Sequence, residues 1–159
     1  YLEILFNANN LTMKQFSNIP HIDLKLLPKI LTVLNKTIKT GHILSCHDIS
    51  EGGLITAIFE MCVGGNMGAQ IHLPGGRMDS WKVERPDYFL FNETSGCFIV
   101  EVRNEKIAKK LFKNIPYLIL GKTKKEKLIT VKNKNKNLFG AGLDELKKAC
   151  QEPMKKIFN

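Results

Sequence analysis

The sequence predicts an α+β fold: one mixed β-sheet flanked by helices, in an α/β/α arrangement with a ferredoxin-like core. Segments with the hydrophobic spacing of helices alternate along the chain with short apolar runs, and glycine, proline and asparagine separate them. The chain has 159 residues, of which 43% are hydrophobic, so it can bury one substantial core. We therefore expect a single domain over residues 1–159.

A helix and a strand are predicted first. Asp23 is placed to cap a helix whose regular part begins near Pro28, and Gly41 is placed to end it. The apolar residues expected on its buried face are Leu27, Ile30, Leu31, Leu34 and Ile38. The apolar run 42–46 then predicts a first buried strand.

A second helix and a second strand follow this run. Apolar residues recur at helical spacing over 54–61, and Gly64 with Gly65 is expected to end the helix. Residues 69–73 alternate between apolar and polar, which is typical of a strand. With the run 42–46, these elements predict a β-α-β unit.

The middle of the chain is expected to begin with an irregular excursion. Residues 73–87 contain two prolines and two adjacent glycines, and Trp81 is a candidate anchor for this segment. Residues 88–91 and 98–102 then predict two strands, joined by the polar loop 92–96.

The last third of the chain predicts a helix, two strands and a terminal helix. The helix covers 105–113 and the strands cover 117–120 and 128–131. The terminal helix starts at Asp144, with Pro153 as a point of bending.

Positive charge is concentrated in the last third of the chain. The net charge is +9 overall, but it is −1 over residues 1–100 and +10 over residues 101–159. Seven of the basic residues lie between 122 and 136, and all seven are lysine with no aromatic residue among them. Arginine and aromatic side chains are the usual means of reading bases, so a solvated hairpin is the favoured interpretation and nucleic-acid binding is not expected. The alternative is a basic module that binds RNA through 122–136.

Metal-site and membrane signals are weak. The cysteines and histidines stand singly, without the spacing of metal ligands, so we expect reduced thiols and no dedicated metal site. There is no run of about 20 apolar residues and no signal peptide, so a cytoplasmic location is expected. The start at Tyr1, without methionine, suggests a fragment of a longer chain.

Residues 46–54 are the first candidate for chemistry, because they join a predicted strand to a predicted helix. Ser50 is a possible helix cap, and the backbone amides of Glu51, Gly52 and Gly53 would lie at the positive end of the helix dipole. His47 and Asp48 would point into the same crevice, where an imidazole can donate to an oxyanion or exchange a proton. The alternative is an ordinary capped helix.

Residues 92–96 are the second candidate. Glu93, Thr94 and Ser95 put a carboxylate and two hydroxyls into a loop between two hydrophobic segments, where Glu93 and Ser95 could face a ligand. The alternative is a turn whose side chains bond their own backbone. No nucleophile arrangement and no phosphate-binding loop of the Walker type is present, so the chain by itself lacks the parts to bind and split a nucleotide.

Three blocks carry a resemblance to a known family. Residues 47–54 (HDISEGGL) with Glu60, residues 85–96 (RPDYFLFNETSG) and residues 146–153 (LKKACQEP) resemble the C-terminal, AIR synthase-related domain of the phosphoribosylformylglycinamidine synthases. The resemblance covers nearly the whole chain. It implies the C-terminal module fold of the aminoimidazole ribonucleotide synthetase superfamily, paired with an N-terminal ATP-binding module of the same chain.

The resemblance also implies an activity for the complete protein. In that family ATP, with magnesium, activates the amide oxygen of formylglycinamide ribonucleotide, and ammonia from a glutaminase displaces phosphate to form the amidine. This chain would be one wall of the ligand cleft or of its pseudo-symmetric counterpart, inactive alone and with no cofactor held tightly. The resemblance assigns catalytic roles to His47 and Asp48. It assigns substrate or phosphate binding to Ser50, Glu51, Gly52, Gly53, Glu93 and Ser95.

Two positions depart from the family pattern. Cys97 stands where arginine is expected, which puts an anion contact in question, and Cys150 stands where tryptophan is usual. Other readings remain: a hydrogenase-maturation, selenophosphate or thiamine-phosphate enzyme of the same superfamily, or a structural docking module with exposed apolar surface.

Overall fold

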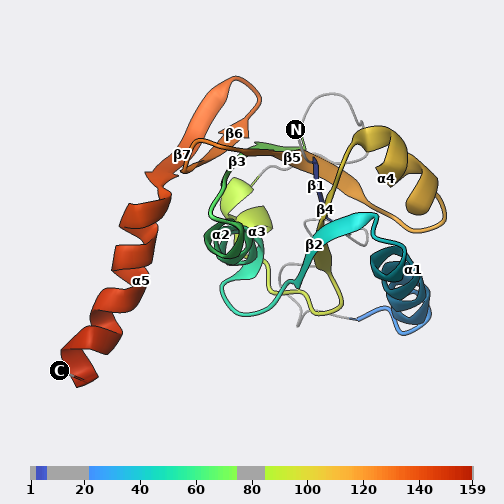
Figure 1. Ribbon diagram of the computed structural model, residues 1–159, viewed down its shortest axis with the longest axis horizontal. Coiled ribbons are helices and arrows are strands. Elements are labelled where there is room, and N and C mark those ends of the chain that lie inside the picture. The colour runs from blue at the N-terminus through green and yellow to red at the C-terminus, as the bar shows by residue number, and fades with distance from the viewer. Residues whose placement is uncertain (1–2, 7–21, 75–84, 159) are drawn as a thin grey trace.

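The computed structural model describes residues 3–6, 22–74 and 85–158. These residues form one seven-stranded mixed sheet with helices on both faces (Figure 1). In chain order the elements are β1 (Glu3–Phe6), α1 (Leu27–Lys39), β2 (Ile43–Asp48), α2 (Gly53–Gly65), β3 (Gly68–Leu73), α3 (Pro86–Leu90), β4 (Phe98–Val102), α4 (Glu105–Leu111), β5 (Leu118–Lys124), β6 (Leu128–Asn133), β7 (Lys136–Gly142) and α5 (Leu143–Phe158). The α+β class with helix-flanked sheet is confirmed.

A ferredoxin-like core is present, but its β-α-β units differ from the predicted one. The sheet order is β2-β4-β1-β5-β3-β6-β7, so β1-α1-β2 and β4-α4-β5 are the two units, with their four strands interleaved. The segment α2-β3-α3 is inserted between them. The predicted pairing of the strands at 42–46 and 69–73 in one unit was wrong, because three strands separate β2 from β3.

Two apolar cores lie on opposite faces of the sheet. Strand β4 shows the alternation directly: Ile99 packs into the core under α2, whereas Val100 and Val102 pack into the core under α1 and α4. The α2 core is the larger and continues across β5, β3 and β6 to Leu143 at the start of α5. This arrangement confirms the α/β/α layering.

Helix α1 has the predicted limits but a different buried face. Pro28 lies in its first turn, Gly41 follows its end with φ of +69°, and Asp23 accepts backbone hydrogen bonds in the turn before it. Ile30 and Leu34 are buried as expected, whereas Leu31 and Ile38 are half exposed. The third buried position is Thr37, whose hydroxyl donates to the Val33 carbonyl at 2.5 Å and so needs no apolar partner.

Strand β2 is an edge strand and not the buried strand predicted from its apolar run. It pairs with β4 along one side, and its residues alternate between half-buried and exposed from Ile43 to Asp48. An edge position explains how a strand can carry Ser45, His47 and Asp48 without burying them fully.

Residues 88–91 were predicted as a strand, and this was wrong: they lie in and just after the short helix α3. Pro86 occupies the first turn, where its fixed φ suits a helix, and Asp87 lies at the positive end of the helix. Arg85 donates two hydrogen bonds to Asp87, 3.0 and 2.6 Å long, and its guanidinium lies 4.1 Å from the Tyr88 ring centroid. The Arg85 hydrogen bonds lower the pKa of Asp87.

The remaining predicted elements agree with the structure. Helices α2 and α4 and strands β3, β4, β5 and β6 have the predicted positions within a few residues, and Asn104 caps α4 by accepting from the Ile107 amide at 3.0 Å. The lysine-rich segment is only partly the predicted hairpin: Lys132, Lys134 and Lys136 lie in the hairpin β6-β7, whereas the other four lysines lie in β5 and in the connection that follows it. Trp81 lies outside the described residues. No helix within the described ranges is long and apolar enough to span a membrane.

Neighbouring residues of α1 provide a test of its buried face. Ile30 is 2% exposed and Leu31 is 46% exposed. We expect Ile30→Ala to lower the free energy of unfolding by about 2–4 kcal/mol, because it leaves a cavity under α1. Leu31→Ala, the matched control, should change it by no more than about 0.5 kcal/mol. Urea denaturation followed by circular dichroism measures both, and equal losses would contradict the assigned face.

Candidate functional site

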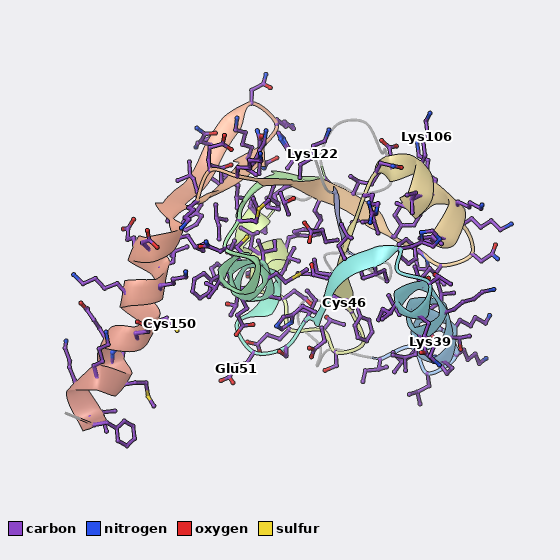
Figure 2. The ribbon with its side chains drawn as sticks, in the orientation of Figure 1. Lys39, Cys46, Glu51, Lys106, Lys122 and Cys150 are labelled. Atoms are coloured by element: carbon purple, nitrogen blue, oxygen red, sulfur yellow. The ribbon has the colours of Figure 1, made fainter. Side chains whose placement is uncertain are left out.

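The turn between β2 and α2 is the centre of the candidate site. It follows the carboxyl end of edge strand β2 and leads into the helix that covers the larger core. Ile49 is buried and its amide donates to the Cys97 carbonyl at 2.9 Å, which ties the turn to the start of β4. Ser50 and Glu51 are exposed, and Figure 2 shows Glu51 pointing away from the body of the protein.

Ser50 does not cap α2 with its side chain, which corrects the sequence prediction. The cap residue is Gly52, in the left-handed conformation with φ of +79°, which has no side chain of its own to accept from the first-turn amides. The Gly53 amide instead donates to the backbone carbonyl of Ser50 at 3.0 Å. Glycine is needed here because two successive residues adopt positive φ, a conformation that other residues avoid.

A hydrogen bond joins the two segments that the sequence singled out. The Gly52 amide donates to Glu93 Oε1 at 2.8 Å, across 41 residues of chain. The Glu93 carboxylate therefore occupies the helix N-terminus at which a phosphate was predicted to bind. The amides of Gly52 and Gly53 both have acceptors within the protein, so a ligand could use the Gly52 amide only by displacing Glu93.

The same two segments also touch through their backbones. A Cβ atom on Gly53 would lie 2.6 Å from the Phe91 carbonyl carbon and 2.8 Å from its Cα. Gly53 is buried, so the chain of the second segment passes directly over the first turn of α2. Absence of a side chain at Gly53 is thus a condition for bringing Glu93 to Gly52.

His47 lies between two oxygen acceptors. Its Nε2 is 3.2 Å from Glu60 Oε2 on α2, and its Nδ1 is 2.6 Å from the backbone carbonyl of Asp48. The Asp48 carboxylate is 62% exposed, and its Oδ1 lies 3.6 Å from the same nitrogen. His47 therefore links the edge strand to α2, and Asp48 is the more accessible of the two predicted catalytic residues.

The loop 92–96 combines a local turn with the long-range contact. Asn92 Oδ1 accepts from the Thr94 amide at 2.8 Å, so the alternative of a self-bonded turn holds for this pair. Glu93 points instead to Gly52, and Ser95 is exposed. Gly96 adopts φ of +82°, as the tight connection to β4 requires.

Cys97 is part of the larger core and not an anion contact. It is buried, and this burial raises the pKa of its thiol to about 11. Burial, with a smaller contribution from Glu101, likewise raises the pKa of Cys62 to about 11. Cys46 and Cys150 are exposed, and all four thiols are free.

Sequence reasoning named Glu60 in the family resemblance but missed its contact with His47, and it missed the close approach of the Phe91 backbone. Glu60 lies seven residues after Gly53, two turns along α2, so helical spacing could have placed it on the side facing the turn. Within 3–6, 22–74 and 85–158, no group of three or more histidine, cysteine, aspartate or glutamate residues could hold a metal ion.

A comparison with protein families identifies the domain. Residues 5–134 match the model described as AIR synthase related protein, C-terminal domain, which is most of the chain. The chain belongs to this family. The description of this family agrees with the resemblance found in the sequence. Segments 47–54 and 85–96, which carry that resemblance, both lie within the matched residues.

Curated relatives point to one enzyme within the family. The phosphoribosylformylglycinamidine synthase subunit PurL of Methanocaldococcus jannaschii is 32% identical over 157 residues, which is 99% of this chain and 20% of the relative. The synthase of Dictyostelium discoideum is 29% identical over 84% of this chain and 11% of its own length. The chain thus spans about a fifth or less of these two relatives.

Solved structures confirm the AIR synthase-related C-terminal fold. Phosphoribosylformylglycinamidine synthase II of Thermotoga maritima superposes with a TM-score of 0.73 at 17% identity, covering 91% of this chain and 25% of that one. The hydrogenase maturation protein HypE in complex with ATP has a TM-score of 0.57 at 15% identity, covering 88% of this chain and 50% of that one. The fold alone is therefore shared by both kinds of protein.

The backbone contact at Gly53 gives a direct test of the site geometry. We expect Gly53→Ala to lower the free energy of unfolding by roughly 2–4 kcal/mol, because the new Cβ meets the Phe91 backbone and φ is positive. Gly64→Ala, in the same helix with no atom within 4 Å of its Cβ, should be neutral or stabilise by up to about 1 kcal/mol. Chemical denaturation of both variants measures the difference, and a harmless Gly53→Ala would refute the close approach.

Thiol modification tests the burial of Cys97. At pH 8 iodoacetamide should alkylate exposed Cys150 and leave Cys97 intact. The folded-state pKa of Cys97 and Cys62 is raised from 9.0 to about 11, so their contribution to stability is complete below pH 9 and is lost as the pH rises through about 11. The free energy of unfolding should fall across that interval. Mass spectrometry of the alkylated peptides measures the reaction of each cysteine, with the urea-unfolded chain as control. Alkylation of Cys97 as fast as that of Cys150 at pH 8 would contradict the burial of Cys97.

Proposed function

We propose that this chain is a module of a phosphoribosylformylglycinamidine synthase. The complete protein would use ATP, with magnesium, to activate the amide oxygen of formylglycinamide ribonucleotide, and ammonia would then displace phosphate to form the amidine. The observation that carries the proposal is the 32% identity to PurL over 99% of this chain, which includes both segments joined by the Gly52–Glu93 hydrogen bond.

The module would form one wall of a ligand cleft. Asp48, Ser50, Glu51 and Ser95 are exposed around the β2–α2 turn and the neighbouring loop, and these side chains would face ligand or the partner module. The hydrogen bond between Gly52 and Glu93, with the close backbone approach at Gly53, would fix the two segments relative to each other. Oriented polar groups around a developing negative charge can lower a barrier by roughly 3 kcal/mol each in favourable cases.

His47 receives a supporting role in this proposal. Both of its ring nitrogens lie near acceptors of the protein itself, so we assign it to holding the turn against α2 rather than to contacting the ligand. Glu60 would help to hold the turn against α2 through its contact with His47. Asp48, with its exposed carboxylate, keeps the role of orienting an incoming group.

The partners of the complete protein follow from the same assignment. An N-terminal ATP-binding module and a glutaminase are proposed, in the cytoplasm. Thermotoga maritima structures described as PurL complexed with ATP and with FGAR, and one described as PurLQS, support the ligands and a multi-component assembly for that protein.

Similarity to HypE does not favour the hydrogenase-maturation alternative. The HypE structures share the fold at 15–16% identity, whereas sequence similarity over nearly the whole chain is to PurL proteins. Sequence similarity at that level carries information about the ligand-facing residues that a shared fold does not.

A graft tests the proposed activity. The 159 residues replace the matching stretch of the Methanocaldococcus jannaschii relative, and ATP-dependent formation of the amidine from formylglycinamide ribonucleotide and ammonium is measured. We expect activity in the graft, and Glu93→Ala within it should lower turnover by roughly tenfold, because the turn loses its fixed position. Glu145→Ala, an exposed position on α5, is the matched control.

Two outcomes of the graft experiment would contradict the proposal. A graft that folds, with cooperative thermal unfolding like that of the host protein, but forms no amidine would reject the assignment of this chain to the synthase. Equal losses from Glu93→Ala and Glu145→Ala would reject the role given to the Gly52–Glu93 contact.

A further inference from the structure

The two faces of the sheet are covered unequally. On the face of α2, apolar residues of β3, β5 and β6 continue the larger core, among them Ile71, Leu120 and Val131. On the opposite face, the core under α1 and α4 takes its strand residues from β2 and β4, including Ile43 and Val100. Among the described side chains, those of β3 and β6 are not part of this smaller core.

The residues on this open part of the sheet are polar and basic. Strand alternation puts Gln70 and His72 of β3 on the face opposite to Ile71, and the parallel register places His72 beside Lys132 of β6. Lys122 lies in register with Gln70, and it is seen on the opposite side of the sheet from α2 in Figure 2.

A groove of about 520 Å³ lies over β3 and β5 at this place. Its lining, among the described residues, is Gln70, His72, Glu105, Ile119, Leu120, Gly121, Lys122 and Lys124. The volume falls within the range of small-molecule sites, which is about 300–1,000 Å³. The groove and the β2–α2 turn use different residues and lie on opposite faces of the sheet.

The charge in the groove is positive. Lys122 and Lys124 bring two ammonium groups, and Glu105, the one carboxylate in the described lining, forms an ion pair with Lys109 on its own helix. Both lysines have interactions of their own within the protein, so the attraction for an anion depends on the summed local charge. Gln70 and His72 add side-chain N–H groups that can donate to an oxyanion.

We propose that this groove binds the phosphate group of a small molecule. Lysine is a phosphate binder that acts as a point charge, so two lysines flanking a concave sheet suit a compact anion. The described lining contains no aromatic residue and no arginine, which are the groups that stack on bases or read them. The phosphate would lie between Lys122 and Lys124, with His72 and Gln70 donating from β3 and Ile119 contacting the organic part.

Two probes separate an inorganic from an organic source of the phosphate. The 159-residue chain, labelled with nitrogen-15, is titrated with inorganic phosphate and with ribose 5-phosphate at constant ionic strength, and amide shifts are followed. We expect saturable shifts at residues 70–72 and 119–124 with both probes. Tighter binding of ribose 5-phosphate would show that the groove also contacts the ester, and equal binding that it recognises the anion alone.

Charge-matched variants test whether the groove lysines are responsible. Lys122→Gln with Lys124→Gln should weaken binding by roughly tenfold, because two charge-assisted contacts are lost. Lys155→Gln with Lys156→Gln removes the same charge from the far end of α5 and should leave the affinity unchanged. If the groove double variant fails to fold, His72→Ala, at an exposed position, serves in its place with a smaller expected loss.

Three outcomes would overturn the proposal. They are no saturable shift with either probe, shifts confined to residues 50–53, and equal weakening by the groove and α5 variants. Stronger binding of a single-stranded RNA, lost steeply with salt and reduced equally by both double variants, would likewise replace the proposal with the general attraction of a basic chain. The graft experiment does not depend on the groove, so failure here leaves the proposed synthase activity to be judged separately.

Discussion

The close approach of the chain after α3 to the first turn of α2 is the constraint on which the candidate site depends. Gly53 has no side chain where the Phe91 backbone passes, and Gly52 adopts a conformation that directs its amide to Glu93. Each feature requires the other, because a residue with a Cβ at 53 would push away the loop that carries Glu93. The site is thus set by backbone packing, and the exposed side chains around it can differ without altering its frame.

The position of α2, β3 and α3 within the fold explains how one small module offers two distinct surfaces. These elements are inserted between the two β-α-β units of the ferredoxin-like core, and they extend the sheet beyond the reach of α1 and α4. The insertion covers one face of the extended sheet with α2 and carries both site segments. On the other face the basic groove lies over β3 and β5, with Glu105 of α4 in its described lining.

The α2 N-terminus and the basic groove differ in how their positive charge is arranged. At the α2 N-terminus the protein supplies its own anion, Glu93, so the positive end of the dipole is already balanced. In the groove the carboxylate of Glu105 is balanced by Lys109, and the lysines of β5 leave local positive charge. The lysines of the last third of the chain are divided among α4, β5, the hairpin β6-β7 and α5.

The class of fold, most element positions, the turn at 47–54, the loop at 92–96 and the family could all be predicted from the amino-acid sequence, because periodicity, glycines and motifs are local properties. Leu31, Ile38 and residues 88–91 were placed incorrectly, since burial of a helix face and the choice of helix over strand after Pro86 depend on what packs nearby. Three features required the folded structure: Glu93, not Ser50, satisfies the start of α2, Glu60 holds His47, and β2 is an edge strand. These contacts join residues far apart in the chain, and local sequence patterns carry no record of which distant backbone will approach a given glycine.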